Sequence, residues 1–334
     1  MARVPDEPQR DVAANAIADW LRGAKATQLA KVFAELGIAE DIGNRTVALG
    51  ALAEQYRMRP ERLLRLLRGF VELNLLAEPE PERFTLTATG SLLRKGAPGS
   101  WREIVLLSAH EVALRSWERL EAGVRGGKGG FHEAYGASIF ECLRGDAELA
   151  ALYDDAMGRM TASIARCVAE NYEFTGVGTV ADIGGGDGTL IATILRHHPG
   201  LRGIVFDRTE DGKRYAPGAT FVTGDFFAAV PGGADRYLLK WILHDWADEQ
   251  AVAILSTIRA AMPEHARLLI IEQVLAEPGA PRDPELTDLN MLMLYGGRER
   301  TRAEFEELCT RAGLRIERAL PLPGTTCGLL EAVR

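Results

Sequence analysis

One histidine directly follows an apolar run that has the composition of a buried strand. The run covers residues 237–243, YLLKWIL, and His244, Asp245 and Trp246 come next. Open α/β sheets bind ligands beyond the carboxyl ends of their strands, and an imidazole titrates near neutral pH. The sequence therefore indicates that His244 is a candidate base beside a binding pocket.

A glycine turn lies some fifty residues upstream. Residues 179–190, TVADIGGGDGTL, read as a β-branched strand, a turn and the start of a helix. Gly184, Gly186 and Gly188 permit positive φ and a close approach of backbone to a ligand. The dinucleotide fingerprint needs a glycine where Thr189 stands, so the turn favours a compact nucleoside carrying an amino acid, as in S-adenosylmethionine (SAM).

Two acidic strand ends extend this cofactor prediction. Asp207 closes the run GIVFD 23 residues after Gly184, where a carboxylate can accept hydrogen bonds from both ribose hydroxyls. Asp225 and Phe226 follow the next apolar run and could bind the adenine amino group and cover its ring. Singly, Asp207 is equally a turn residue and Phe226 a core residue, but together and in this order they predict a cofactor site.

The elements that carry these residues alternate between strand and helix. Strand-like runs begin near residues 179, 202, 219, 235, 266, 314 and 327, and helical patterns separate most of them. This alternation predicts an α/β fold with a mostly parallel sheet covered on both faces. Only PLPGTT separates the last two runs, too few residues for a crossover helix, so the last strand is predicted to be antiparallel.

The N-terminal part has a different pattern. Residues 10–36 predict two amphipathic helices that stop at Gly37. Residues 48–93 predict a helix, a second helix beginning at Pro60, and a hairpin, which is the layout of a winged helix-turn-helix module. Arginines 62, 65 and 68 could form a basic face for DNA, but glutamates 78, 80 and 82 in the wing would repel phosphate.

Composition excludes several classes of function. The 334 residues are 47% hydrophobic and carry a net charge of −8, which argues against a nucleic-acid partner. Four scattered cysteines without a CxxC pair, and a polar N-terminus without a signal peptide, predict a cytoplasmic protein; no apolar run is long enough to cross a membrane. The glycine-rich stretch at residues 123–130 lacks P-loop spacing and is expected to be a surface connection.

Together these motifs resemble the SAM-dependent O-methyltransferases of the caffeate and hydroxyindole type, including bacterial enzymes that tailor small metabolites. DIGGGDG, GDFF, LLKWILHDWADEQ, IIEQVL and DLNMLMLYGGRERTRAEF carry the resemblance. It implies a Rossmann-like, seven-stranded class I methyltransferase sheet in residues 166–334. Residues 1–165 would form a mainly helical dimerisation domain with lid helices, and its winged-helix module would span about residues 46–95.

The resemblance also implies roles for individual residues. His244 would be the general base, Glu272 and Glu299 would flank it, and Asp245 would support it. Lys240 and Thr161 would join the cofactor residues. The acceptor would be bordered by Tyr153, Met157, Met160, Met291 and Tyr295. The segment NMLMLYGGRERT is shorter by about a residue than its plant counterpart, so phenylpropanoid specificity is not carried over.

These inferences predict a homodimeric enzyme that methylates a phenolic hydroxyl of an aromatic secondary metabolite, using SAM and no metal. S-adenosyl-L-homocysteine would be the second product. Two alternatives remain open at this stage. One keeps the SAM site but performs other chemistry, such as N-methylation. The other is a SAM-sensing regulator that binds DNA through the winged helix, which predicts salt-dependent binding to duplex DNA.

Overall fold

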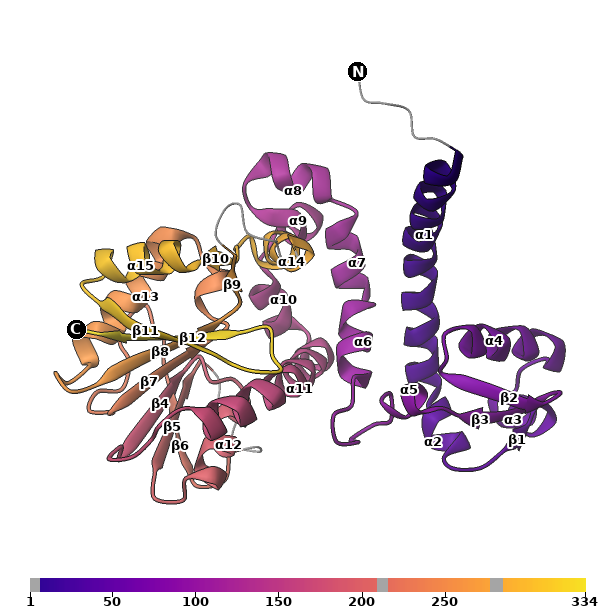
Figure 1. Cartoon of the computed structure of the whole chain (residues 1–334), viewed down its shortest axis with the longest axis horizontal. Coiled ribbons are helices and arrows are strands. Elements are labelled where there is room, and N and C mark those ends of the chain that lie inside the picture. The colour runs from indigo at the N-terminus through magenta and orange to yellow at the C-terminus, as the bar shows by residue number, and fades with distance from the viewer. Residues whose placement is uncertain (1–6, 209–215, 277–284) are drawn as a thin grey trace. The chain divides into compact units, whose positions relative to one another are not determined.

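The computed structural model describes residues 7–208, 216–276 and 285–334 of the chain (Figure 1). Its contacts divide the chain into two compact units, Met1–His110 and Glu111–Arg334. This division differs from the boundary expected near residue 165. The helices of residues 111–165 belong with the sheet unit because α9 packs on α14, and α11 packs on α12.

The first unit is mainly helical and contains the predicted helix-turn-helix and hairpin. Pro60 stands at the first position of α4, where its missing N–H costs no hydrogen bond. Strands β2 and β3 pair as an antiparallel hairpin, and β1 adds to β3. The elements are α1 (Glu7–Leu36), α2 (Ile38–Ile42), β1 (Val47–Ala48), α3 (Leu49–Tyr56), α4 (Pro60–Glu72), β2 (Leu76–Glu80), β3 (Arg83–Leu86), α5 (Ala88–Ser91) and α6 (Arg102–Ser108).

The expectation of two helices before Gly37 was wrong. Residues Glu7–Leu36 form one continuous helix, and Gly37 follows it in the left-handed conformation at φ 70°. Gly23 lies inside the helix, where a glycine costs about 1 kcal/mol relative to alanine but does not stop the chain. The predicted stop at Gly37 is confirmed.

The second unit is built on a seven-stranded sheet with the order β11-β12-β8-β7-β4-β5-β6. The strands from β6 to β8 are parallel, and β12 is antiparallel to both β8 and β11, which confirms the prediction for the last strand. The strands are β4 (Thr179–Ile183), β5 (Arg202–Asp207), β6 (Ala219–Thr223), β7 (Arg236–Lys240), β8 (Arg267–Glu272), β11 (Arg315–Pro321) and β12 (Gly328–Val333).

Helices cover both faces of this sheet (Figure 1), and a hydrophobic core lies on each face. Alternate side chains of β7 enter different cores: Tyr237 and Leu239 pack with α13 and α15, whereas Leu238 packs with α11 and α12. This is the period of two expected of a strand buried on both faces. The helices of the unit are α7 (Glu111–Trp117), α8 (Leu120–Gly126), α9 (Gly129–Tyr135), α10 (Ile139–Gly145), α11 (Ala147–Asn171), α12 (Thr189–His197), α13 (Asp248–Ala261), α14 (Glu285–Tyr295) and α15 (Arg302–Arg311).

The glycine-rich stretch at residues 123–130 is only in part the surface connection expected from the sequence: residues 124–128 are exposed. It spans the end of α8 and the start of α9, and Gly123, Gly129 and Gly130 are buried. A Cβ on Gly130 would stand 2.3 Å from the carbonyl oxygen of Ser116, and one on Gly129 would stand 2.2 Å from that of Leu292. These glycines therefore let the backbones of α7, α9 and α14 approach closely.

In the described part of the chain, no helix combines the length and the apolar character required to cross a bilayer.

Candidate active site

The candidate site lies where the chain reverses its order through the sheet. Strand β4 has β5 and β6 on one side and β7 and β8 on the other. The crevice beyond the carboxyl ends of β4 and β7 is therefore the topological switch point, where such sheets bind ligands. The glycine turn follows β4 and the histidine segment follows β7, so the fold brings both motifs to this crevice.

His244 is carried by a short 3-10 turn, η2 (Leu243–Asp245), directly after β7. The chain leaves the strand at Trp241, which has φ 55°, a left-handed conformation that costs a side-chain-bearing residue roughly 1–2 kcal/mol. The reversal points the N–H groups of Ile242 and Leu243 at the carboxylate of Glu272, and Oε1 accepts both at 3.0 and 2.9 Å. Glu272 therefore anchors the turn as well as facing the ring.

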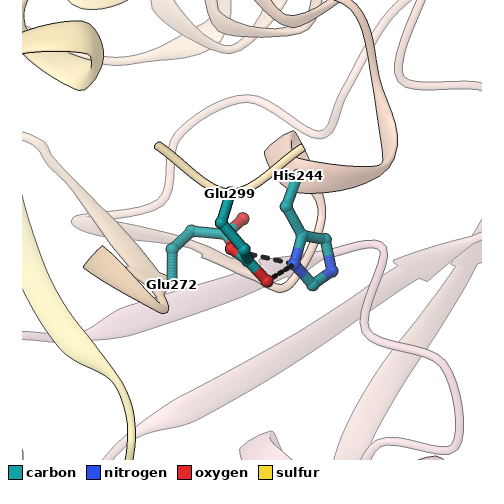
Figure 2. Close-up of side chains that lie close together, drawn as sticks. All are labelled: His244, Glu272 and Glu299. Carbon is teal, nitrogen blue, oxygen red and sulfur yellow. Dashed lines mark hydrogen bonds and ion pairs between the residues drawn. The ribbon is translucent and has the colours of Figure 1, made fainter. Parts of the chain in front are cut away.

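Three carboxylates surround the buried imidazole of His244, and Figure 2 shows two of them, those of Glu272 and Glu299. Nδ1 lies 3.1 Å from Oε1 of Glu299 and 3.5 Å from Oε2 of Glu272, while Nε2 lies 3.5 Å from Oδ1 of Asp245. A hydrogen bond from Nδ1 to Glu299 fixes the ring and its tautomer, with the proton on Nδ1. Nε2 is then the nitrogen that can accept a proton.

This arrangement changes the basicity of His244. Burial lowers its pKa, but the negative charges of Glu272, Asp245 and Glu299 outweigh burial and raise the pKa from 6.5 to about 9. Burial raises the pKa of Asp245 to about 7, against the opposing effect of His244, and it also raises the pKa of Glu272. Asp245, Glu272 and Glu299 each keep one buried oxygen without a hydrogen-bond partner among the described residues.

Two short paired strands bring the glutamates together. Glu272 ends β8, and β9 (Val274–Leu275) follows it; Glu299 directly precedes β10 (Arg300–Thr301). Val274 pairs with Arg300 and Leu275 pairs with Thr301 in parallel register. The backbone N–H of Glu299 also donates to Oδ1 of Asp288 on α14 at 2.8 Å. Residues from distant parts of the chain thus meet at one imidazole.

The glycine turn has the geometry of a cofactor cradle. Gly184, Gly186 and Gly188 have φ values of 74°, 53° and 79°. A Cβ on Gly184 would stand 2.4 Å from Cδ1 of Ile242, whereas one on Gly186 would meet nothing within 4 Å. Oδ2 of Asp207 accepts the N–H of Gly186 at 2.8 Å, so the predicted ribose ligand also closes the turn. A side chain at Gly184 would therefore clash with Ile242, whereas the space beside Gly186 is open.

The other predicted cofactor residues lie around this turn. Phe226 is 3.8 Å from the same Cβ position on Gly184, and Asp225 beside it is exposed. Lys240, at the end of β7, donates from Nζ to Oγ1 of Thr161 on α11 at 2.8 Å. Burial lowers the pKa of Lys240, while Asp182 opposes the shift. Helix α11 thus meets the end of β7.

The predicted acceptor residues come from α11 and α14. The hydroxyl groups of Tyr153 and Tyr295 lie 3.0 Å apart, and burial raises the pKa of both, with Asp245 adding to the effect. Met291 is buried on α14, and the carbonyl oxygen of Met157 accepts from Thr161. Met160 precedes Thr161 on α11 and is half-buried. The tyrosine pair thus joins α11 to α14 close enough to Asp245 for its charge to act on both hydroxyl groups.

Sequence reasoning missed two tryptophans. Trp246 packs edge-on against Phe226 and Phe227, at ring centroid distances of 6.0 and 4.9 Å. The indole of Trp241 has the ammonium of Lys240 4.2 Å from its ring centroid and stacks at 20° with the ring of His244, 6.4 Å away. Both are aromatic residues within three positions of His244, and that proximity was a usable signal.

The chain is similar over most of its length to known methyltransferases. Residues 117–315 match the O-methyltransferase domain family. The O-demethylpuromycin-O-methyltransferase of Streptomyces alboniger is 36% identical, over 93% of this chain and 86% of that protein.

Two solved structures extend the comparison. The mitomycin 7-O-methyltransferase MmcR has a TM-score of 0.89 at 34% identity, over 98% of this chain and 99% of that one. An O-methyltransferase from neocarzinostatin biosynthesis, in complex with S-adenosyl-L-homocysteine and 1,4-dihydroxy-2-naphthoic acid, has a TM-score of 0.76 at 30% identity, over 92% and 95%. The sheet order, the glycine turn and these relatives agree, and the chain belongs to the SAM-dependent O-methyltransferase family of natural-product biosynthesis.

Proposed function

We propose that this enzyme methylates a phenolic hydroxyl of a small aromatic metabolite and that His244 is its general base. The observation that carries the proposal is the asymmetric environment of the imidazole. Nδ1 is held by Glu299 and Glu272, and Nε2 is left with Asp245 at 3.5 Å, beyond hydrogen-bond distance for a well-formed contact. A base needs a proton-accepting atom of this kind, oriented by a partner on the opposite nitrogen.

The raised basicity of His244 suits a phenol. A phenol of pKa ~10 is about 3.5 units above an ordinary histidine, so proton transfer would cost about 5 kcal/mol. With the His244 pKa at about 9, the gap falls to about one unit, or roughly 1.4 kcal/mol. The three carboxylates thus stabilise the imidazolium that forms when the hydroxyl gives up its proton.

SAM fits the cradle at the end of β4. When bound, it would supply an activated methyl group. Gly184 and Gly186 would allow its close approach, and Asp207 would accept hydrogen bonds from its ribose hydroxyls. The remaining contacts we assign to Asp225, Phe226, Lys240 and Thr161. The solved relative that contains S-adenosyl-L-homocysteine supports the choice of cofactor.

The acceptor would lie between α11 and α14. Met157, Met160 and Met291 would provide an adaptable apolar wall for a flat ring. Tyr153 and Tyr295 are joined by their hydroxyl groups and provide polar contacts beside it. The naphthoic acid in the neocarzinostatin relative is an aromatic ligand of the same general kind.

We propose that no metal takes part. His244, Glu272 and Glu299 offer ligand atoms within 4.8 Å of one another, a spacing that could also hold an ion. The 3.1 Å contact from Nδ1 to Glu299 instead suits a proton between the two atoms, and Oε1 of Glu272 already accepts two backbone N–H groups. Activity should survive dialysis against EDTA and should not increase with added Mg²⁺ or Zn²⁺. A loss that a divalent ion restores would contradict this part of the proposal.

We also propose that the enzyme is a homodimer formed through its first unit. Helix α1 exposes large apolar side chains, including Val12, Ile17, Trp20 and Leu21. Isolated apolar residues are common on surfaces, but several on one helix suit a protein interface. Light scattering should give twice the chain mass of 36.4 kDa. A monomeric mass at micromolar concentration would contradict the proposal.

DNA binding has less support. Arg68 is one of the three arginines that could form a basic face. It forms a bidentate ion pair with Glu78 of the hairpin, at 3.0 and 2.9 Å. This pairing neutralises part of the surface that would have to meet phosphate. A gel shift with duplex DNA at physiological salt should show no complex.

The decisive test replaces His244. We expect His244→Ala to lower kcat on 1,4-dihydroxy-2-naphthoic acid, or on another phenol that the wild type methylates, by ~10²- to 10⁴-fold. SAM affinity, measured by calorimetry, should stay within about threefold, because the imidazole is assigned to the acceptor. His265→Gln is a matched control, because this exposed histidine pairs with Asp235 before the amino ends of β7 and β8, away from the carboxyl ends where His244 lies. A His244→Ala enzyme with wild-type kcat would overturn the assignment, and turnover of arylamines but not phenols would favour N-methylation.

A further inference from the structure

The segment from Gly297 to Arg300 runs directly against the turn that carries His244. The N–H of Arg298 donates to the carbonyl oxygen of His244 at 2.8 Å, and the side chain of Glu299 meets Nδ1. A Cβ on Gly297 would stand 1.9 Å from the same carbonyl oxygen and 2.9 Å from Cα of Asp245. Only glycine can occupy this position without displacing the turn.

Arg300 holds the same turn from its buried side. Its side chain is fully buried. Nη1 donates to the carbonyl oxygen of Leu243 at 2.7 Å, and Nη2 donates to that of Trp246 at 2.8 Å. Nη2 and Nε also donate to Oδ1 of Asp248, at 2.7 and 3.1 Å. One guanidinium therefore joins the first residue of the turn, the residue that follows it and the start of α13.

This geometry is specific to arginine. A buried cation is costly unless its charge is paired and its donors have acceptors, and here Asp248 supplies the opposite charge while two carbonyl oxygens accept further N–H groups. A lysine would bring one ammonium on a flexible chain and could not span the same three acceptors in a fixed plane. An arginine with a structural role alone could donate to any buried acceptors. Arg300 instead donates to the carbonyl oxygens of Leu243 and Trp246, which lie on either side of His244 in the chain.

We propose that Arg300 and Gly297 are positioning residues for methyl transfer, which hold the His244 turn so that Nδ1 meets Glu299 while Nε2 stays available to the acceptor. The inference rests on the proposed role of His244. We assign neither residue a contact with the substrate. Their effect on the reaction passes entirely through the position of the imidazole.

The first experiment compares Arg300→Lys with Arg311→Lys. Arg311 pairs with Glu249, next to Asp248, but does so at the surface. We expect Arg300→Lys to lower kcat by ~10²-fold, while the affinity for SAM stays within about twofold. Arg311→Lys should keep wild-type kcat. Wild-type kcat in Arg300→Lys would overturn the inference, as would an equal loss of kcat and of SAM affinity, which would indicate general unfolding.

A second measurement separates positioning from stability. In Arg300→Ala, millimolar methylguanidine should restore part of kcat, about tenfold, and the same concentration of urea should restore none. Adding Arg300→Lys to His244→Ala should cost no further activity, because the imidazole through which Arg300 acts is gone. A further loss in the double variant would show that Arg300 acts by another route. Wild-type activity of His244→Ala alone would instead refute the proposed function.

Gly297 provides an independent test. Gly297→Ala should lower kcat by at least tenfold without changing SAM affinity, because the new methyl group displaces the carbonyl of His244. Gly232→Ala is the control, since a Cβ there would have an ordinary contact of 3.7 Å with the carbonyl oxygen of Ala261. A fully active Gly297→Ala enzyme that remains folded would contradict the inference.

Discussion

The imidazole of His244 and the glycine turn at residues 184–188 follow adjacent strands, β7 and β4, but they are held in different ways. The turn is defined by one continuous stretch of chain, which Asp207 closes through the N–H of Gly186. The imidazole is held by side chains from separate segments, and Glu272 and Glu299 are almost completely buried. The glycine turn, which is the local half of the site, is thus formed within one stretch of chain. The surroundings of His244, which are the assembled half, require side chains from segments far apart in the sequence.

Among the tests of this comparison, the largest effect is expected for a substitution that affects the glycine turn. Asp207→Ala removes both the proposed ribose ligand and the acceptor for Gly186, so we expect the Kd for SAM to rise ~30- to 100-fold, equivalent to about 2–3 kcal/mol. Asp207→Asn, which retains an acceptor oxygen, should lose less. Calorimetry gives the Kd, and kcat at saturating SAM should change by less than about threefold. A large loss of kcat at saturation would show that the two halves are not separable.

The next effect tests the assembled half through pH. Because the carboxylates raise the His244 pKa to about 9, the imidazole is mostly protonated at neutral pH, and kcat/KM should rise with pH through that value. Glu299→Gln removes one negative charge and should lower the pKa, which moves this rise to lower pH by about one unit. Glu306→Gln, on the surface of α15, should leave the profile unchanged. A rise that moves to higher pH would contradict the assigned role of Glu299.

The smallest effect examines the point where the halves meet. Gly186→Ala adds only backbone strain, about 1 kcal/mol, because its Cβ would meet nothing within 4 Å. We expect the Kd for SAM to rise about fivefold and kcat to stay unchanged. Gly184→Ala would in addition press on Ile242, two residues before His244, and should lower kcat as well. Identical effects of the two substitutions would mean that Gly184 does not couple the cradle to the base.

The same contrast explains how much could be predicted from the sequence. The alternation of strand-like and helical runs predicted the seven strands, and the short connection PLPGTT predicted the antiparallel last strand. The order in which the strands lie in the sheet is a long-range property that was not predicted; the resemblance supplied only the class of sheet. The predicted break in helix α1 was wrong, and the surface connection predicted at residues 123–130 holds only for residues 124–128. A glycine alone does not reveal whether it ends a helix or lets two backbones touch.

The candidate site shows the same limit. Gly184 and Asp207 could be assigned from spacing within one stretch of sequence. Glu272 and Glu299 came only from the family resemblance, because no spacing connects them to His244 before β9 and β10 pair. The fully buried Arg300 was missed altogether: an arginine in a charged segment such as GGRERT gives no sign that its guanidinium faces inward. Burial of that kind is decided by tertiary structure.

Strands β9 and β10 pair in parallel, so the excursion of the chain from Leu275 to Arg300 begins and ends at the same place in the fold. Helix α14, which carries Met291 and Tyr295, lies inside that excursion, and Glu272 precedes it. Helix α14 could therefore be exchanged for that of another family member, provided that Asp288 and residues 297–299 are kept, because Asp288 accepts the N–H of Glu299 and the N–H of Arg298 donates to His244. Such grafts offer a way to recruit new acceptors on an unaltered proton-transfer apparatus.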